Sequence, residues 1–144
     1  MTVFFKRFDT TIAAPAYQSR GAIGLDLAAR VEVTIPPQSV GYVPLNIALR
    51  LPEGTWALIA ARSSLHKKGL MMANGIGVGD HDFCGEEDEY RAALFNFSSQ
   101  PVIVEKGERV AQLIVMQGEQ IIFEELEHFD GAASRGGFGS TGSK

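Results

Sequence analysis

The chain is broken into many short runs of β-forming residues, and this feature limits its fold more than any other. Runs rich in Val, Ile, Thr and aromatic residues are separated by Gly, Pro and Asp turn signals, with almost no helical periodicity. Many short strands at this spacing are typical of an all-β barrel or sandwich. We predict strands in the runs 3–8, 21–29, 31–35, 43–51, 56–61, 90–97, 102–104, 109–115 and 120–126.

One stretch departs from the β pattern. Between Arg62 and Gly69 the chain has serines that could cap a helix, a short helical span and a terminating glycine. We therefore expect at most one short helix in the fold, of one or two turns, and we place it here.

Length and charge limit the class of protein. At 144 residues the chain is long enough for one domain that buries roughly 68% of its unfolded surface. A formal net charge of -4 argues against a nucleic-acid-binding or membrane-binding surface, because phosphate-rich partners require a basic face. A small anionic ligand needs only a local cationic pocket, so the composition leaves such a ligand open.

The cysteine content and the apolar runs bear on location. Cys84 is the only cysteine, so no intrachain disulfide can form, and we expect a buried, inert thiol in a reducing cytoplasm. Lys6, Arg7 and Asp9 interrupt the N-terminal apolar residues, which argues against a signal peptide. No uncharged apolar run approaches the roughly 20 residues of a membrane helix. The sequence therefore predicts a soluble, cytoplasmic protein.

The segment Gly75–Glu86 combines four glycines with Asp80, Asp82 and Phe83. Glycine at this density lets the backbone bend tightly and approach a ligand closely, so we interpret the segment as a binding hairpin. An acidic surface turn fits the same residues equally well. A calcium-binding EF-hand loop does not fit, because Arg91 stands where a bidentate Glu is required.

The composition changes at residue 131. Residues 131–144 contain five glycines and Phe138 as their one large apolar side chain, so they cannot bury enough surface to fold alone. We predict a β domain at residues 1–130 and a flexible glycine-rich arm at 131–144. The arm is either a disordered terminus or a lid in which Arg135 and Phe138 close on an anionic, aromatic ligand.

Five segments of the chain, in order, resemble the motifs of the trimeric deoxyuridine triphosphate pyrophosphatase (dUTPase) family. Each segment alone is a weak signal, but five in order with near-family spacing are a strong one. They are Gly24–Ala28, Arg62–Leu65, Asn74–Glu86, Gly107–Ile114 and Arg135–Gly142.

The resemblance implies a jelly-roll-like fold, a homotrimer with active sites at subunit contacts, and hydrolysis of dUTP to dUMP and pyrophosphate with Mg²⁺. Asp80 would be the general base that activates water at the α-phosphorus. Asn74 and the backbone at Gly77 and Val78 would recognise the uracil edge. Phe83 would lie against the deoxyribose and exclude a 2′-hydroxyl.

The phosphates of the substrate would meet donors from other motifs. Arginine suits bidentate contact with phosphate oxygens, and serine hydroxyls and amides donate hydrogen bonds to them. The expected phosphate-binding residues are Arg62, Ser63, Ser64, Gln112 and Arg135. Phe138 would stack on the uracil. Because Mg²⁺ prefers to keep its bound waters, we expect no protein side chain to ligate the ion directly. We expect Asp26 either to accept hydrogen bonds from those waters or to make a subunit contact.

The chain departs from the family pattern in three places. Val78-Gly79-Asp80 stands where the family usually has Val-Ile-Asp, the residues Glu87–Glu89 lengthen the following segment, and Arg135 lies two positions closer to the aromatic residue of the arm. The related dCTP deaminases use a glutamate where this chain has Ala93, which argues against deamination. Two alternatives to an enzyme remain: a nucleotide-binding protein without turnover and a structural β sandwich. A pyrophosphate-release assay would distinguish either of them from a dUTP-hydrolysing enzyme.

Overall fold

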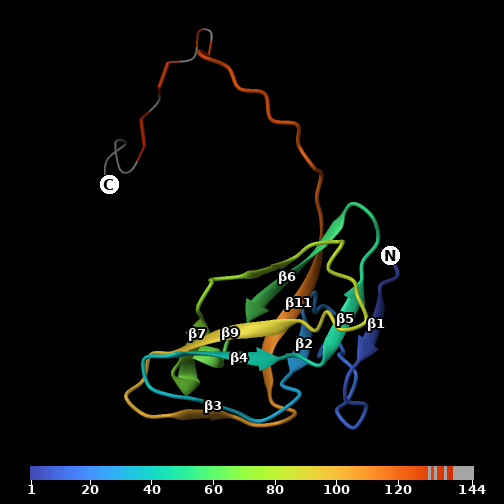
Figure 1. The fold of residues 1–144 in the computed structure, drawn as a ribbon, viewed down its shortest axis with the longest axis vertical. Coiled ribbons are helices and arrows are strands. Elements are labelled where there is room, and N and C mark those ends of the chain that lie inside the picture. The colour runs from blue at the N-terminus through green and yellow to red at the C-terminus, as the bar shows by residue number, and fades with distance from the viewer. Residues whose placement is uncertain (130, 132, 135, 138–144) are drawn as a thin grey trace.

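The computed structural model describes residues 1–129, 131, 133, 134, 136 and 137. The described residues form an all-β fold with a single 3-10 turn (Figure 1). The elements are β1 (Phe4–Arg7), β2 (Leu25–Ala28), β3 (Val33–Ile35), β4 (Val40–Pro44), β5 (Ile47–Arg50), β6 (Thr55–Ala61), η1 (Leu65–Lys68), β7 (Leu70–Met72), β8 (Gly77–Gly79), β9 (Arg91–Asn96), β10 (Val102–Val104) and β11 (Arg109–Gln117).

The largest sheet has the strand order β2-β11-β6-β8, and all its pairings are antiparallel. A second sheet has the order β4-β9-β7, and β1-β5 and β3-β10 form two-stranded sheets. Fully buried residues alternate with more accessible ones along β6 and β9, as expected for strands with one face on a core. The all-β sandwich that the sequence predicts is therefore confirmed.

The core lies between the inward faces of these sheets. Most of its members are Leu, Ile or Val side chains, which lose most of their exposure to water. The largest fully buried apolar side chains are Leu27, Ile35, Val43, Leu45, Ile47, Leu70, Leu94, Val104 and Val110.

Two local predictions are refined by the structure. The predicted helix is a 3-10 turn over Leu65–Lys68, and Gly69 ends it with a φ of 79°, which glycine adopts without steric cost. The predicted strand at 43–51 is interrupted at Asn46, which has a φ of 62°. Its side chain exchanges hydrogen bonds with the backbone of Asp9, and these bonds hold the left-handed conformation.

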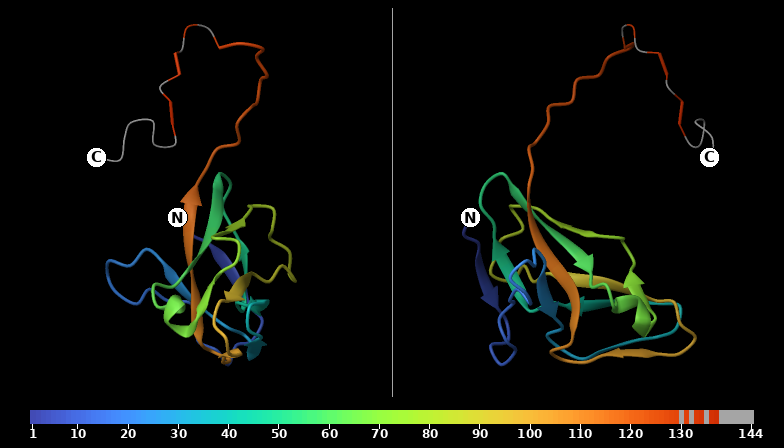
Figure 2. Two further views of the ribbon diagram at one scale, coloured as in Figure 1. Left: turned by 90° about the vertical axis from the view of Figure 1, so that its left-hand side faces the viewer. Right: turned by 180° about the vertical axis from the view of Figure 1, so that it is seen from behind.

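Two other predictions are wrong. The segment Gly75–Glu86 is not a hairpin, because only β8 is a strand and it pairs with β6 instead of with the residues that follow. The run 120–126 forms no strand in the described part of the chain. After β11 the chain leads away from the body (Figures 1 and 2), so this run has no neighbouring strand to pair with.

Among the described residues, no helix has the length and apolarity that a membrane crossing requires.

Candidate active site

Two arginines converge on Asp26 at one end of the four-stranded sheet. Arg62 follows β6 and donates from Nε to Asp26 Oδ1 at 3.0 Å and from a terminal nitrogen to the carbonyl of Arg109 at 3.2 Å. Arg109 Nη1 lies 3.1 Å from Asp26 Oδ2, an ion pair that lacks hydrogen-bond geometry. Two positive charges against one negative charge leave this cluster cationic, which favours an anionic ligand.

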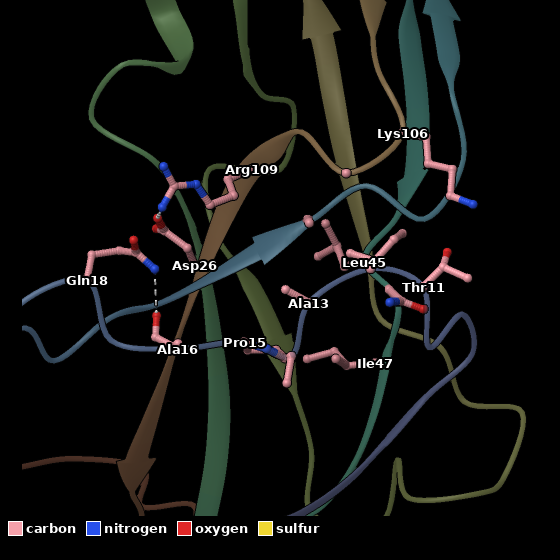
Figure 3. Close-up of a pocket in the computed structure, with 15 residues that line it drawn as sticks. Thr11, Ala13, Pro15, Ala16, Gln18, Asp26, Leu45, Ile47, Lys106 and Arg109 are labelled. Carbon is pink, nitrogen blue, oxygen red and sulfur yellow. Dashed lines mark hydrogen bonds and ion pairs between the residues drawn. The ribbon is translucent and has the colours of Figure 1, made fainter.

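Figure 3 shows the side chains of Asp26 and Arg109 pointing toward one another at the edge of a cavity of about 600 Å³. Lys106 lies on the opposite side of this cavity. It is paired with Asp9 at 2.7 Å, and this pair holds the pKa of the Asp9 carboxyl below its usual range. Asp9 therefore already neutralises the charge of Lys106. Arg109 also lines this cavity, and it lies beside Arg62.

Gln112 joins the cluster from β11. Its backbone is in register with Asp26 on one side and Ala60 on the other, and its amide nitrogen donates to the carbonyl of Ala61 at 2.9 Å. Gly24 makes room for it, because a Cβ at that position would lie 2.5 Å from Gln112 Oε1. The glycine of the first motif thus allows the glutamine of the fourth motif to reach the end of β6.

Ser63 and Ser64 follow Arg62 and are both exposed. Ser64 occupies the N-cap position of η1, but its hydroxyl makes no capping hydrogen bond. The adjacent Leu65 is 4% exposed and fixes the turn to the core. The fold therefore brings together the predicted residues Asp26, Arg62, Ser63, Ser64 and Gln112. We call these five residues and Arg109 the anion cluster.

The second group of predicted residues lies around β8. Asp80 follows Gly79 and is exposed, and it lines a groove of about 1100 Å³ together with Trp56, Val78 and Gly118. Asn74 is also exposed, in the turn that enters β8. We call Asn74, Gly77, Val78, Asp80 and Phe83 the β8 cluster.

Tyr90 lies beneath the β8 cluster and is not among the residues that the sequence motifs indicate. Its side chain is 5% exposed, and its ring makes an edge contact with Phe83 at a centroid distance of 5.2 Å. A Cβ at position 79 would collide with the Tyr90 ring and hydroxyl. The departure from the family pattern at Gly79 thus has a steric reason, because Tyr90 fills the space that an isoleucine would need.

The added residues Glu87–Glu89 are tied to the body of the fold. Arg30 holds Glu89 with two hydrogen bonds of 2.8 and 2.9 Å, and the Glu89 carboxylate also accepts the backbone N–H of Asn46 at 3.0 Å. Glu89 is 8% exposed, so this charge is buried with its partners in place. The end of the insertion is consequently fixed just before Tyr90.

Asp80 and Arg62 lie toward opposite ends of β6 in one chain, although Gly77 and Gln112 pair with the adjacent β6 residues Ile59 and Ala60. Gly79 pairs with Ala57 near the start of β6, whereas Arg62 follows the end of that strand. Five residue steps in extended conformation lead from Ala57 to Arg62, which is a span of about 17 Å. The fold therefore does not bring Asp80 into contact with the anion cluster within one chain.

Other predicted positions have simple outcomes. Cys84 is exposed, so the expectation of a buried thiol is wrong, because the loop that carries it lies on the surface. Arg135 and Phe138 lie outside the described residues.

Within the described ranges, no group of three or more His, Cys, Asp or Glu side chains is arranged to hold a metal ion. Arg109 was missed, although it stands inside the fourth motif.

Residues 10–142 match the protein family described as dUTPase. This match covers β2 to β11, both clusters and residues 131–142 of the arm. The class that the fold and the site define is therefore that of the nucleoside triphosphate hydrolases.

Individual relatives agree with this class. A deoxyuridine 5'-triphosphate nucleotidohydrolase of Hydrogenobaculum sp. (strain Y04AAS1) is 40% identical over 147 residues and covers 100% of both chains. One of Dictyoglomus turgidum is 37% identical over 146 residues and covers 97% of each. A variant dUTPase of Staphylococcus bacteriophage 80alpha, solved with dUpNHpp, has the same fold, with a TM-score of 0.83 at 22% identity over 98% of each chain. The chain belongs to the dUTPase family and is an enzyme that hydrolyses dUTP.

Proposed function

We propose that Asp80 is the general base of dUTP hydrolysis in this enzyme. One carboxylate oxygen takes a proton from water, the water oxygen bonds to the α-phosphorus, and the bond from that phosphorus to the bridging oxygen breaks. The products are dUMP and pyrophosphate. The observation that carries this proposal is the exposed position of Asp80 in the groove beside Val78, where solvent and substrate can reach its carboxylate.

The uracil is recognised at the free edge of β8. This strand is the last in the order β2-β11-β6-β8, so within the described residues its outer edge has no strand partner. Such an edge offers backbone N–H and C=O groups, which match the donor and acceptor pattern of a uracil. Gly77, Val78 and Asn74 supply these groups. Phe83, which is 39% exposed and apolar, packs on the deoxyribose and gives a 2′-hydroxyl no partner.

The triphosphate binds the anion cluster. The guanidinium groups of Arg62 and Arg109 and the amide of Gln112 are donors, and the exposed hydroxyls of Ser63 and Ser64 add two more. These groups stabilise the charge that shifts onto the leaving pyrophosphate in the transition state.

We propose that the enzyme is a homotrimer in which each active site combines two or more copies of the chain. Within one chain, Arg62 lies about 17 Å along β6 from the point where Gly79, the residue before Asp80, is paired. This separation supports shared sites, because a base must lie within hydrogen-bond reach of the water that attacks the bound phosphate. The segment after β11 supports close association, since Ile122 and Phe123 are 91% and 88% exposed. Apolar residues at this exposure favour burial against another copy.

Magnesium fits this site through substrate oxygens and water. Asp26 Oδ2 is buried and has no hydrogen bond to the described residues, so it can accept one from a water of a hydrated ion. The bound ion would neutralise part of the triphosphate charge. The arm residues Arg135 and Phe138 complete our proposal as the γ-phosphate and uracil contacts of a closing lid.

An assay of the purified protein tests the reaction. With Mg²⁺ and dUTP we expect one pyrophosphate per dUMP, whereas dCTP should release no ammonia. Removal of divalent ions with EDTA should lower turnover, and added Mg²⁺ should restore it. Comparable turnover of dTTP would contradict a close fit of the β8 edge to uracil.

A further inference from the structure

The hydroxyl of Tyr90 is buried and has no hydrogen-bond partner among the described residues. A buried hydroxyl without a partner costs free energy, since it loses its bonds to water and gains none. Phenylalanine would provide the same ring packing without that cost. The hydroxyl is therefore the part of Tyr90 that packing does not explain.

The backbone of Tyr90 is held rigidly. Its N–H donates to the carbonyl of Ile47 and its carbonyl accepts from Leu45, both at 2.9 Å. The preceding Glu89 is fixed by Arg30. A side chain that begins at such an anchored position is a firm support for whatever packs against it.

Two residues of the β8 cluster rest on this support. The Tyr90 ring and hydroxyl lie against Gly79, directly before Asp80, and the ring meets Phe83 edge-on with 77° between the planes. Gly79 has no side chain to anchor its own position, and the Tyr90 side chain, which comes from the residue just before β9, fills the space beside it. This contact therefore fixes the backbone directly before Asp80.

The pKa of the Tyr90 hydroxyl also reflects the charge of Asp80. Burial, followed by the negative charges of Asp80 and Asp88, raises the pKa of Tyr90 to about 12. The hydroxyl consequently keeps its proton at neutral pH and can act as a donor.

We propose that Tyr90 is a positioning residue for Asp80, with its ring fixing Gly79 and its hydroxyl serving as the donor that orients the Asp80 carboxylate when substrate is bound. One carboxylate oxygen would then face Tyr90 and leave the other free to take the proton from water. This inference rests on the proposed role of Asp80 as the base. The proposed role of Tyr90 depends on glycine at position 79, because a larger residue there would collide with the Tyr90 ring.

The test compares Tyr90→Phe with the unchanged enzyme under saturating dUTP. We expect kcat to fall about tenfold, with KM and the Kd for dUpNHpp nearly unchanged, because a misaligned base slows the chemical step without weakening binding. The melting temperature should stay the same or rise, since the change removes an unpartnered buried hydroxyl. An unchanged kcat would make Tyr90 a packing residue and overturn the inference.

A second comparison separates this inference from the role of Asp80. In an Asp80→Asn background, Tyr90→Phe should cause no further loss of turnover, because its effect passes through the Asp80 carboxylate. The same tenfold loss in both backgrounds would overturn positioning through Asp80. If Asp80→Asn alone left turnover unchanged, the proposed base would fail instead, and the two failures are therefore distinguishable.

Discussion

Arg62 donates to Asp26 at 3.0 Å, and this bond joins the end of β6 to β2 across the intervening strand β11. The Asp26 side chain is 11% exposed and that of Arg62 is 28% exposed, so water replaces the bond poorly. The same carboxylate faces Arg109. The orientation of the two arginines that we propose to bind phosphate therefore depends on one mostly buried carboxylate.

Replacing Asp26 with alanine should weaken both the fold and substrate binding. The change leaves Arg62 without its carboxylate partner, and we expect the free energy of unfolding to fall by about 1–3 kcal/mol. The kcat/KM for dUTP should fall as well, because the guanidinium group loses its fixed direction. Urea unfolding and steady-state kinetics measure the two effects. Glu32→Ala, at an exposed position, is the control. Equal stability of the two variants would contradict a structural role for Asp26.

Replacing Asp80 with asparagine should remove the base and keep the shape of the side chain. We expect kcat to fall by about 10² to 10⁴ while dUpNHpp still binds. Asp82→Asn is the matched control, because Asp82 lines the same groove two residues away. A severe loss from Asp82→Asn with a mild one from Asp80→Asn would transfer the role of base to Asp82.

Sharing of sites between copies can be tested by mixing two inactive variants. Asp80→Asn lacks the base and Arg62→Ala lacks a phosphate contact, so each variant alone should be nearly inactive. Co-expressed copies should recover activity, with about a quarter of the sites intact if the two chains assort randomly in a symmetric oligomer. Light scattering should give about 47 kDa, three times the 15.6 kDa chain. An inactive mixture, or an active monomer, would contradict shared sites.

The close contact between Gly79 and Tyr90 predicts the cost of an added methyl group. Gly79→Ala would push a Cβ into the Tyr90 ring, which its anchored backbone keeps in place. We expect a loss of about 1–3 kcal/mol in the free energy of unfolding, measured with urea. Gly21→Ala is the control, because nothing lies within 4 Å of a Cβ there. A stability equal to that of the control would mean that β8 moves to accommodate the methyl group.

The sequence predicted local structure best where one strand faces a core. Runs of β-forming residues identified β3 and β6, and Gly69 correctly marked the end of the short helical turn. It did not predict the interruption at Asn46, because the hydrogen bonds that hold this conformation come from Asp9, 37 positions away. The predicted strand at 120–126 was wrong, since pairing requires a neighbour that local pattern does not reveal.

The same distinction applies to the site. Motif matching selected Arg62, Gln112 and Asp80 and implied active sites at subunit contacts. The strand register adds that Gly79, the residue before Asp80, pairs about 17 Å along β6 from Arg62 in one chain. Motif matching missed Tyr90, although Gly79 was the signal. A small residue where relatives carry a large one suggests that another side chain fills the space.

The arm gives the last prediction. Deleting residues from Ser134 onward should leave the fold and the oligomer intact, because the strands end at Gln117, but it should lower turnover at least about tenfold by leaving the site open to water. Ordering the arm costs about 1–2 kcal/mol of backbone entropy per residue, so closure needs contacts to both uracil and phosphate. Arg135→Ala should therefore weaken dUTP binding and spare dUMP, which lacks a γ-phosphate. Calorimetric titration measures both affinities. Equal losses for the two nucleotides would exclude a γ-phosphate contact, and full activity of the truncated protein would exclude a lid.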